Sequence, residues 1–231
     1  MKNKIVVALD VSTFDQAKKL IDELTGHVGV FKVGKQLFTR LGPTIVEYIK
    51  KQGGQVFLDL KFHDIPNTVR GACHAAGDLD VDFLTIHTMG GFEMMRAARQ
   101  GVIDSGNEKT KVLGVTILTS INQDVLREDL NLKVPLGEQV LHLAKLAQMA
   151  GIQGVVASPK EITLIREHTE KDFLIVTPGI RPTWYQKDDQ KRTMTPKDAI
   201  EAGADYIVIG RPITMAHEPK QAAMDVAKEG K

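Results

Sequence analysis

The sequence lacks several features that mark specialised classes of protein. Its 231 residues include a single cysteine, Cys73, so no intrachain disulfide is possible, and this usage fits a reducing cytoplasm. The 30 lysines and arginines nearly balance the 29 aspartates and glutamates, whereas a nucleic-acid surface normally brings a basic excess. Low-complexity segments and linkers rich in glycine, serine or proline are absent. We therefore expect one globular domain spanning 1–231, with no nucleic-acid partner.

Long hydrophobic runs are also missing. The first apolar run, Ile5 to Leu9, follows two lysines but is too short for the hydrophobic region of a signal peptide. No other stretch approaches the ~18 apolar residues of a membrane span. We therefore expect no membrane partner.

Short apolar runs alternate with longer amphipathic stretches along the whole chain. Strand–helix alternation predicts a parallel sheet, and eight repeats in roughly 250 residues are typical of a closed (β/α)8 TIM barrel. A doubly wound open sheet is the main alternative, but its glycine-rich fingerprint is missing after the first strand, where the chain reads Leu9-Asp10-Val11-Ser12. We predict the barrel. The expected strands are Ile5–Leu9, Gly29–Val33, Gln55–Lys61, Val81–Ile86, Val112–Leu118, Gly154–Ala157, Phe173–Val176 and Tyr206–Ile209.

Charged residues gather where the first three expected strands end. Asp59 and Lys61 are two apart on one strand, so alternation places both on one face, in apolar surroundings where charge is costly unless paired. Active sites of these barrels lie at the carboxyl ends of the strands. Costly charge is concentrated at functional sites, so we favour a functional cluster over a structural ion pair. The residues expected to converge are Asp10, Lys32, Asp59, Lys61 and Asp64.

Two late segments combine glycine with arginine. Thr177-Pro178-Gly179-Ile180-Arg181 follows the seventh expected strand, and Gly210-Arg211-Pro212 follows the eighth. The loops after these strands often hold phosphate, because glycine lets backbone N–H groups approach the anion and arginine offers a bidentate fork. We predict a phosphate site there. The long polar loop from Thr177 to Arg192 fits either a solvated loop or a lid over ligand.

Metal binding has little support in the sequence. The seven histidines are scattered, with no His-x-x-x-His or Cys-x-x-Cys spacing. Asp59 and Asp64 could bind Mg²⁺, but Lys61 lies between them and already supplies positive charge. We interpret His63 as a packing or hydrogen-bonding residue, and we expect no metal and no cofactor.

The run Asp59-Leu60-Lys61-Phe62-His63-Asp64-Ile65-Pro66-Asn67-Thr68 resembles the signature of the orotidine 5′-phosphate decarboxylase family, in its bacterial branch. The resemblance extends along the chain in the expected order. The further segments that carry it are Ala8-Leu9-Asp10, Phe31-Lys32-Val33-Gly34, Leu118-Thr119-Ser120, Thr177-Pro178-Gly179-Ile180-Arg181 and Val208-Ile209-Gly210-Arg211.

The resemblance implies a homodimeric (β/α)8 barrel that converts orotidine 5′-monophosphate to uridine 5′-monophosphate and CO2, without cofactor or metal. It implies that Lys32, Asp59, Lys61 and Asp64 form the catalytic network, with Asp64 reaching into the partner subunit's site. It also implies the substrate-binding residues: Asp10 and Lys32 for the ribose hydroxyls, Thr68 near the ribose, Thr119 for the pyrimidine, and Arg181, Gln190, Gly210 and Arg211 for the phosphate.

Two alternatives remain open. Mg²⁺-dependent sugar-phosphate enzymes of the same superfamily, such as 3-hexulose-6-phosphate synthase or keto-gulonate-phosphate decarboxylase, resemble this chain in an Asp-x-Lys-x-x-Asp core. The continuation Ile65-Pro66-Asn67-Thr68 argues against them. A non-catalytic nucleotide-binding barrel is the other alternative, and a missing member of the charged array would have favoured it.

Overall fold

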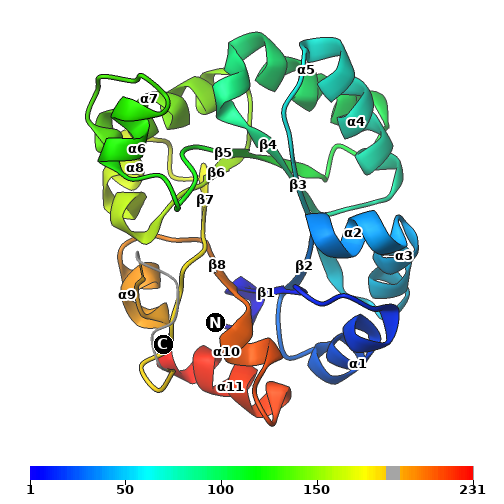
Figure 1. Ribbon diagram of the computed structural model, residues 1–231. Coiled ribbons are helices and arrows are strands. Elements are labelled where there is room, and N and C mark those ends of the chain that lie inside the picture. The colour runs from blue at the N-terminus through cyan, green and yellow to red at the C-terminus, as the bar shows by residue number, and fades with distance from the viewer. Residues whose placement is uncertain (186–192, 231) are drawn as a thin grey trace.

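Eight parallel strands close into a barrel in which each strand pairs with the next and β8 pairs with β1. A computed structural model describes residues 1–185 and 193–230. Figure 1 looks along the barrel, with the helices arranged around the ring of strands. The strands are β1 (Ile5–Ala8), β2 (Val30–Gly34), β3 (Gln55–Phe62), β4 (Phe83–His87), β5 (Lys111–Val115), β6 (Gly154–Val156), β7 (Leu174–Thr177) and β8 (Tyr206–Ile209). The predicted single-domain (β/α)8 architecture is confirmed.

The helices bury an apolar face against the strands and expose a polar one. In α1, the Thr13 side chain and Gln16 form a capping box at the start, and Leu20, Ile21 and Leu24 are buried. The α-helices are α1 (Phe14–Leu24), α2 (Lys35–Leu41), α3 (Thr44–Lys51), α4 (Pro66–Asp78), α5 (Gly91–Asp104), α6 (Gln123–Glu128), α7 (Leu136–Met149), α8 (Ile162–His168), α9 (Pro196–Glu201), α10 (Arg211–Thr214) and α11 (Pro219–Glu229). Short 3-10 turns η1 (Lys2–Lys4), η2 (Thr88–Gly90) and η3 (Pro159–Glu161) complete the elements of the described chain.

The core has two parts. A large cluster fills the space between the strands and the helices, and Cys73 on α4 is fully buried in it. Burial raises the pKa of the Cys73 thiol to about 12, as expected for a structural thiol. A smaller cluster fills the barrel interior; it consists of Val6, Ala8, Val30, Phe57, Phe83, Leu113, Val176 and Val208. The interior is therefore packed below the level at which a ligand could enter.

At the amino ends of the strands, side chains cap the backbone of alternate strands. The residue just before β4, β6 or β8 accepts a hydrogen bond from the second backbone N–H of the preceding strand, which would otherwise lack a ladder partner. The pairs are Asp82 with Val56, Gln153 with Val112 and Asp205 with Ile175, at 2.7, 2.8 and 2.8 Å.

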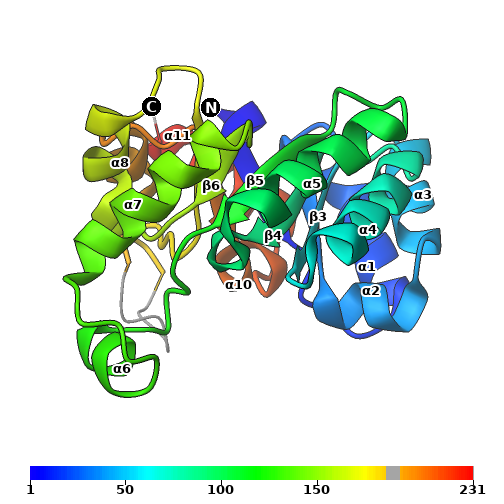
Figure 2. The ribbon, with the colours of Figure 1, turned by 90° about the horizontal axis from the view of Figure 1, so that it is seen from above.

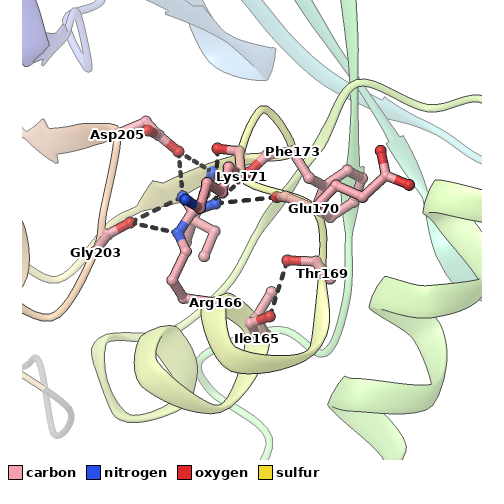
Figure 3. Close-up of polar contacts among 9 residues, drawn as sticks. Ile165, Arg166, Thr169, Glu170, Lys171, Phe173, Gly203 and Asp205 are labelled. Carbon is pink, nitrogen blue, oxygen red and sulfur yellow. Dashed lines mark hydrogen bonds and ion pairs between the residues drawn. The ribbon is translucent and has the colours of Figure 1, made fainter.

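Arg166 on α8 extends one of these caps into a network (Figure 3). Its guanidinium donates to the Asp205 carboxylate at 2.6 Å, to the Gly203 carbonyl at 2.9 Å and to the Phe173 carbonyl at 2.9 Å. It thereby joins α8 to the segments that lead into β7 and β8. Such contacts contribute to stability and not to catalysis, because they lie at the end of the barrel opposite the strand carboxyl ends.

The chain after β5 differs from the prediction. The strand ends at Val115, three residues before the predicted Leu118, and a short unpredicted helix, α6, follows. Asn122 caps this helix by accepting from the Val125 N–H at 2.9 Å. In Figure 2, α6 projects past the same end of the barrel as α10, away from the labelled termini. In residues 1–185 and 193–230, no helix is both long enough and apolar enough to cross a membrane.

Candidate active site

A cavity of about 270 Å³ opens at the carboxyl ends of the strands. Phe57, Val156 and Val208 line it with apolar surface, and Pro178 and Leu118 contribute from the loops. Most of the residues predicted from the sequence also line this cavity. They are Asp10, Lys32, Asp59, Lys61, Thr119, Arg181, Gly210 and Arg211.

The charged residues in the cavity form a chain of ion pairs. Lys61 Nζ lies 2.6 Å from Asp59 Oδ1, and Lys32 Nζ lies 3.4 Å from Asp59 Oδ2. Lys32 Nζ also lies 3.5 Å from Asp10 Oδ1. The side chains of Lys32 and Asp59 are each 12% exposed, so water screens their interaction weakly. The convergence predicted for these four residues is therefore present within one chain.

Asp59 is held as a carboxylate despite its burial. Burial alone would raise its pKa, but the positive charges of Lys32 and Lys61 lower it, as do hydrogen bonds from Lys61 and Thr85. The net effect is a pKa below the ordinary value, so this carboxylate is ionised at neutral pH. The cavity thus contains fixed charges of both signs beside an apolar wall.

The backbone at Lys61 departs from the regular strand geometry on which the alternation of side chains depends. The pairing of β3 with β4 moves from Leu58–Leu84 to Phe62–Ile86, four residues along β3 against two along β4. Within this irregularity Lys61 has φ +56°, a left-handed conformation that is uncommon for a residue with a Cβ. The predicted contact with Asp59 is confirmed, but a β-bulge produces it.

Sequence reasoning missed one polar side chain beside the array. Thr85 on β4 is fully buried; its hydroxyl donates to Asp59 Oδ1 at 2.9 Å and accepts from the Lys61 N–H at 3.0 Å. His87, two residues further along β4, lies beside His63, with ring centroids 5.4 Å apart and ring planes tilted by 41°. A polar residue inside the expected strand 81–86 was the available signal for Thr85. His63 makes the packing contact predicted for it.

Ile180 and Arg181, which follow β7, are held by contacts with Met194 and Tyr185. The Arg181 N–H donates to the Met194 carbonyl at 3.0 Å, and Ile180 forms an isolated bridge with Met194. The Arg181 guanidinium lies 5.8 Å from the ring centroid of Tyr185, over its face. These contacts hold Gly179 and Arg181 at the cavity, across from the β1–β3 charges.

Two predicted residues, Asp64 and Thr68, do not line the cavity in this chain. Both are exposed. Asp64 instead accepts a hydrogen bond from the Ile65 N–H at 2.7 Å. Gln190 lies outside the described residues, as do residues 186–192 of the long polar loop expected from Thr177 to Arg192. Across 1–185 and 193–230, no cluster of three or more histidine, cysteine, aspartate or glutamate side chains is arranged to hold a metal ion.

A closed (β/α)8 barrel with a charged, partly apolar cavity at the carboxyl ends of its strands places this chain in the class of barrel enzymes. Comparison with known proteins narrows this class. Residues 3–226 match the model of the family described as "Orotidine 5'-phosphate decarboxylase / HUMPS family". The chain belongs to this family.

Two relatives and one solved structure show how similar the chain is to its family. The orotidine 5'-phosphate decarboxylase of Geotalea daltonii is 53% identical over 229 residues, covering 98% of this chain and 95% of the relative. That of Trichlorobacter lovleyi is 53% identical over 230 residues, covering 99% and 95%. A crystal structure of the Lactobacillus acidophilus orotidine 5'-phosphate decarboxylase superposes with a TM-score of 0.88 at 42% identity, covering 98% of each chain.

Proposed function

We propose that this chain decarboxylates orotidine 5′-monophosphate to uridine 5′-monophosphate, with Lys61 as the group that stabilises and then protonates C6. The reaction follows from the family and from relatives of about 50% identity over nearly the whole chain. The observation that carries the residue assignment is the Lys61–Asp59–Lys32 array in the cavity.

The array suits the chemistry of this reaction. When the bond between C6 and the carboxylate breaks, CO2 leaves and the electron pair stays on C6, where it has little resonance relief. The Lys61 ammonium stabilises the developing charge and then transfers a proton to C6. Asp59 lies beside the departing carboxylate and orients Lys61 through their 2.6 Å contact. Preorganised charge aimed at the atom where charge develops is usually the largest single contribution to stabilising a transition state.

The remaining cavity residues bind the rest of the nucleotide. Asp10 and Lys32 hold the ribose hydroxyls, and Thr119 contacts the pyrimidine. Gly210 and Arg211 after β8, with Arg181 after the neighbouring β7, hold the phosphate. Gln190 is assigned to the phosphate by resemblance alone. Because the phosphate is remote from C6, its binding energy is available for aligning the base.

Asp64 and Thr68 serve the active site of a second copy of the chain. Both are exposed here and lie outside the cavity of their own barrel. Ile65, between them in sequence, is 66% exposed, so an apolar side chain accompanies the two polar ones on this surface. A homodimer would cover this segment and bring Asp64 to the neighbouring array. The single cysteine is consistent with a cytoplasmic location.

The rival function is a Mg²⁺-dependent reaction of a sugar phosphate within the same family. A spectrophotometric assay separates the two, because consumption of orotidine 5′-monophosphate changes its ultraviolet absorbance. We expect full turnover after exhaustive chelation. Activity that disappears on chelation and returns with Mg²⁺, or turnover only of a hexulose phosphate, would contradict the proposal.

A further inference from the structure

Thr85 lies next to the charged array and is hydrogen-bonded to two of its members, Asp59 and Lys61. It is 0% exposed and lies on β4, two residues after Phe83 of the barrel interior. Its hydroxyl donates to Asp59 Oδ1 at 2.9 Å and accepts from the Lys61 N–H at 3.0 Å. Both hydrogen-bonding roles of this one hydroxyl are therefore used within the array.

Each of these hydrogen bonds has a separate consequence. The donated bond orients Asp59 Oδ1, the same oxygen that lies 2.6 Å from Lys61 Nζ. The accepted bond satisfies the Lys61 N–H, which leaves the regular β3–β4 ladder at the bulge. It also supports the left-handed backbone of Lys61, a conformation that surrounding contacts must stabilise.

We propose that Thr85 is a positioning residue for decarboxylation, whose hydroxyl fixes the Lys61 ammonium relative to the reacting carbon by holding both the Asp59 carboxylate and the Lys61 backbone. The inference rests on the proposed roles of Asp59 and Lys61. Thr85 does not line the cavity, so it touches no substrate and acts through its two neighbours. A displacement of about 1 Å in such a group is enough to lower turnover substantially.

The test compares kcat and KM of three variants at this position. Thr85→Val keeps the shape but removes the hydroxyl, Thr85→Ser keeps the hydroxyl but removes the methyl, and Thr85→Ala removes both. A hydrogen bond to a charged group corresponds to a change of roughly 10- to 100-fold in kcat. We expect kcat to fall by that factor in Thr85→Val and Thr85→Ala, with KM nearly unchanged. In Thr85→Ser we expect kcat to stay within a few-fold of the parent.

Thr110→Val is the matched control. Thr110 is also fully buried, and its hydroxyl donates to the Val81 carbonyl at 2.5 Å, before β4 and far from the strand carboxyl ends. Its loss is expected to lower stability without lowering kcat. If Thr85→Val fails to fold, the comparison of Thr85→Ser with Thr85→Ala decides. These two variants differ only in the hydroxyl, which a positioning role requires and a packing role does not.

Two results would overturn the inference. One is parental kcat in Thr85→Val or Thr85→Ala, and the other is a Ser variant as slow as the Ala variant. Lys61→Ala is measured in parallel. If it also retains turnover, the proposed function of the array fails; if it is inactive while Thr85→Ala is fully active, only the role of Thr85 fails.

Discussion

Lys61 shows at the scale of one residue what a sequence can and cannot predict. Its type, its spacing from Asp59 and its apolar neighbours indicated a paired charge in a buried site, and the pair is present at 2.6 Å. The left-handed backbone and the β-bulge were not predictable, because they depend on pairing with β4, a contact between segments distant in sequence. Thr85 was missed for the same reason.

His87 provides a test of electrostatics at the edge of the array. Burial, together with the positive charges of His63, Lys35 and Lys61, lowers the pKa of His87 to about 4. The unfolded chain then binds a proton at this position below about pH 6.5, while the folded chain binds it only near pH 4. Stability should therefore fall as the pH drops from 6.5 to 4.

We predict that His87→Gln loses less stability than the parent across this window. The measurement is the urea midpoint at pH 7 and at pH 4.5, at one protein concentration. His142→Gln, on the exposed face of α7, is the control for removing a histidine. Equal losses in the parent and the His87 variant would show that His87 does not contribute to acid sensitivity.

At the scale of elements, the apolar periodicity was sufficient to predict the eight strands and the helix that follows each. It failed after β5, where α6 occupies a segment for which no element was predicted. This helix is six residues long and buries only Leu126, so it leaves almost no periodic signal. The capping Asn122 was the one available indication.

The Arg166 network predicts a stability effect that is separable from catalysis. Arg166→Met would leave the Asp205 carboxylate without its cation and remove donors from the Gly203 and Phe173 carbonyls. Losing partners for partly buried groups costs about 2 kcal/mol or more of unfolding free energy. We expect that loss in denaturant unfolding, with kcat unchanged well below the transition.

The matched control is Arg127→Met, because Arg127 forms exposed pairs with Asp124 and Glu128 on α6. Such pairs are worth about 1 kcal/mol or less. Similar stability in the two variants would mean that the Arg166 network does not hold the amino end of the barrel together.

At the scale of the whole molecule, the cavity of one barrel contains the charged array, whereas Asp64 of the same chain lies outside this cavity. The sequence motif places Asp64 three residues from Lys61, yet the turn into α4 directs it to an exposed segment outside the cavity. Periodicity within one chain could not show where this segment points. The proposal that it completes a neighbouring site makes the dimer part of the catalyst.

Mixing two inactive variants tests this central claim most directly. Lys61→Ala should bind uridine 5′-monophosphate but lose turnover by about 10⁴-fold or more, and Asp64→Ala should also be severely impaired. A hybrid dimer contains one intact site, formed by Lys61 of one subunit and Asp64 of the other. After equal mixing and subunit exchange, we predict recovery of roughly a quarter of the parental activity on orotidine 5′-monophosphate. No recovery in a preparation where hybrid dimers are demonstrated would contradict the shared site.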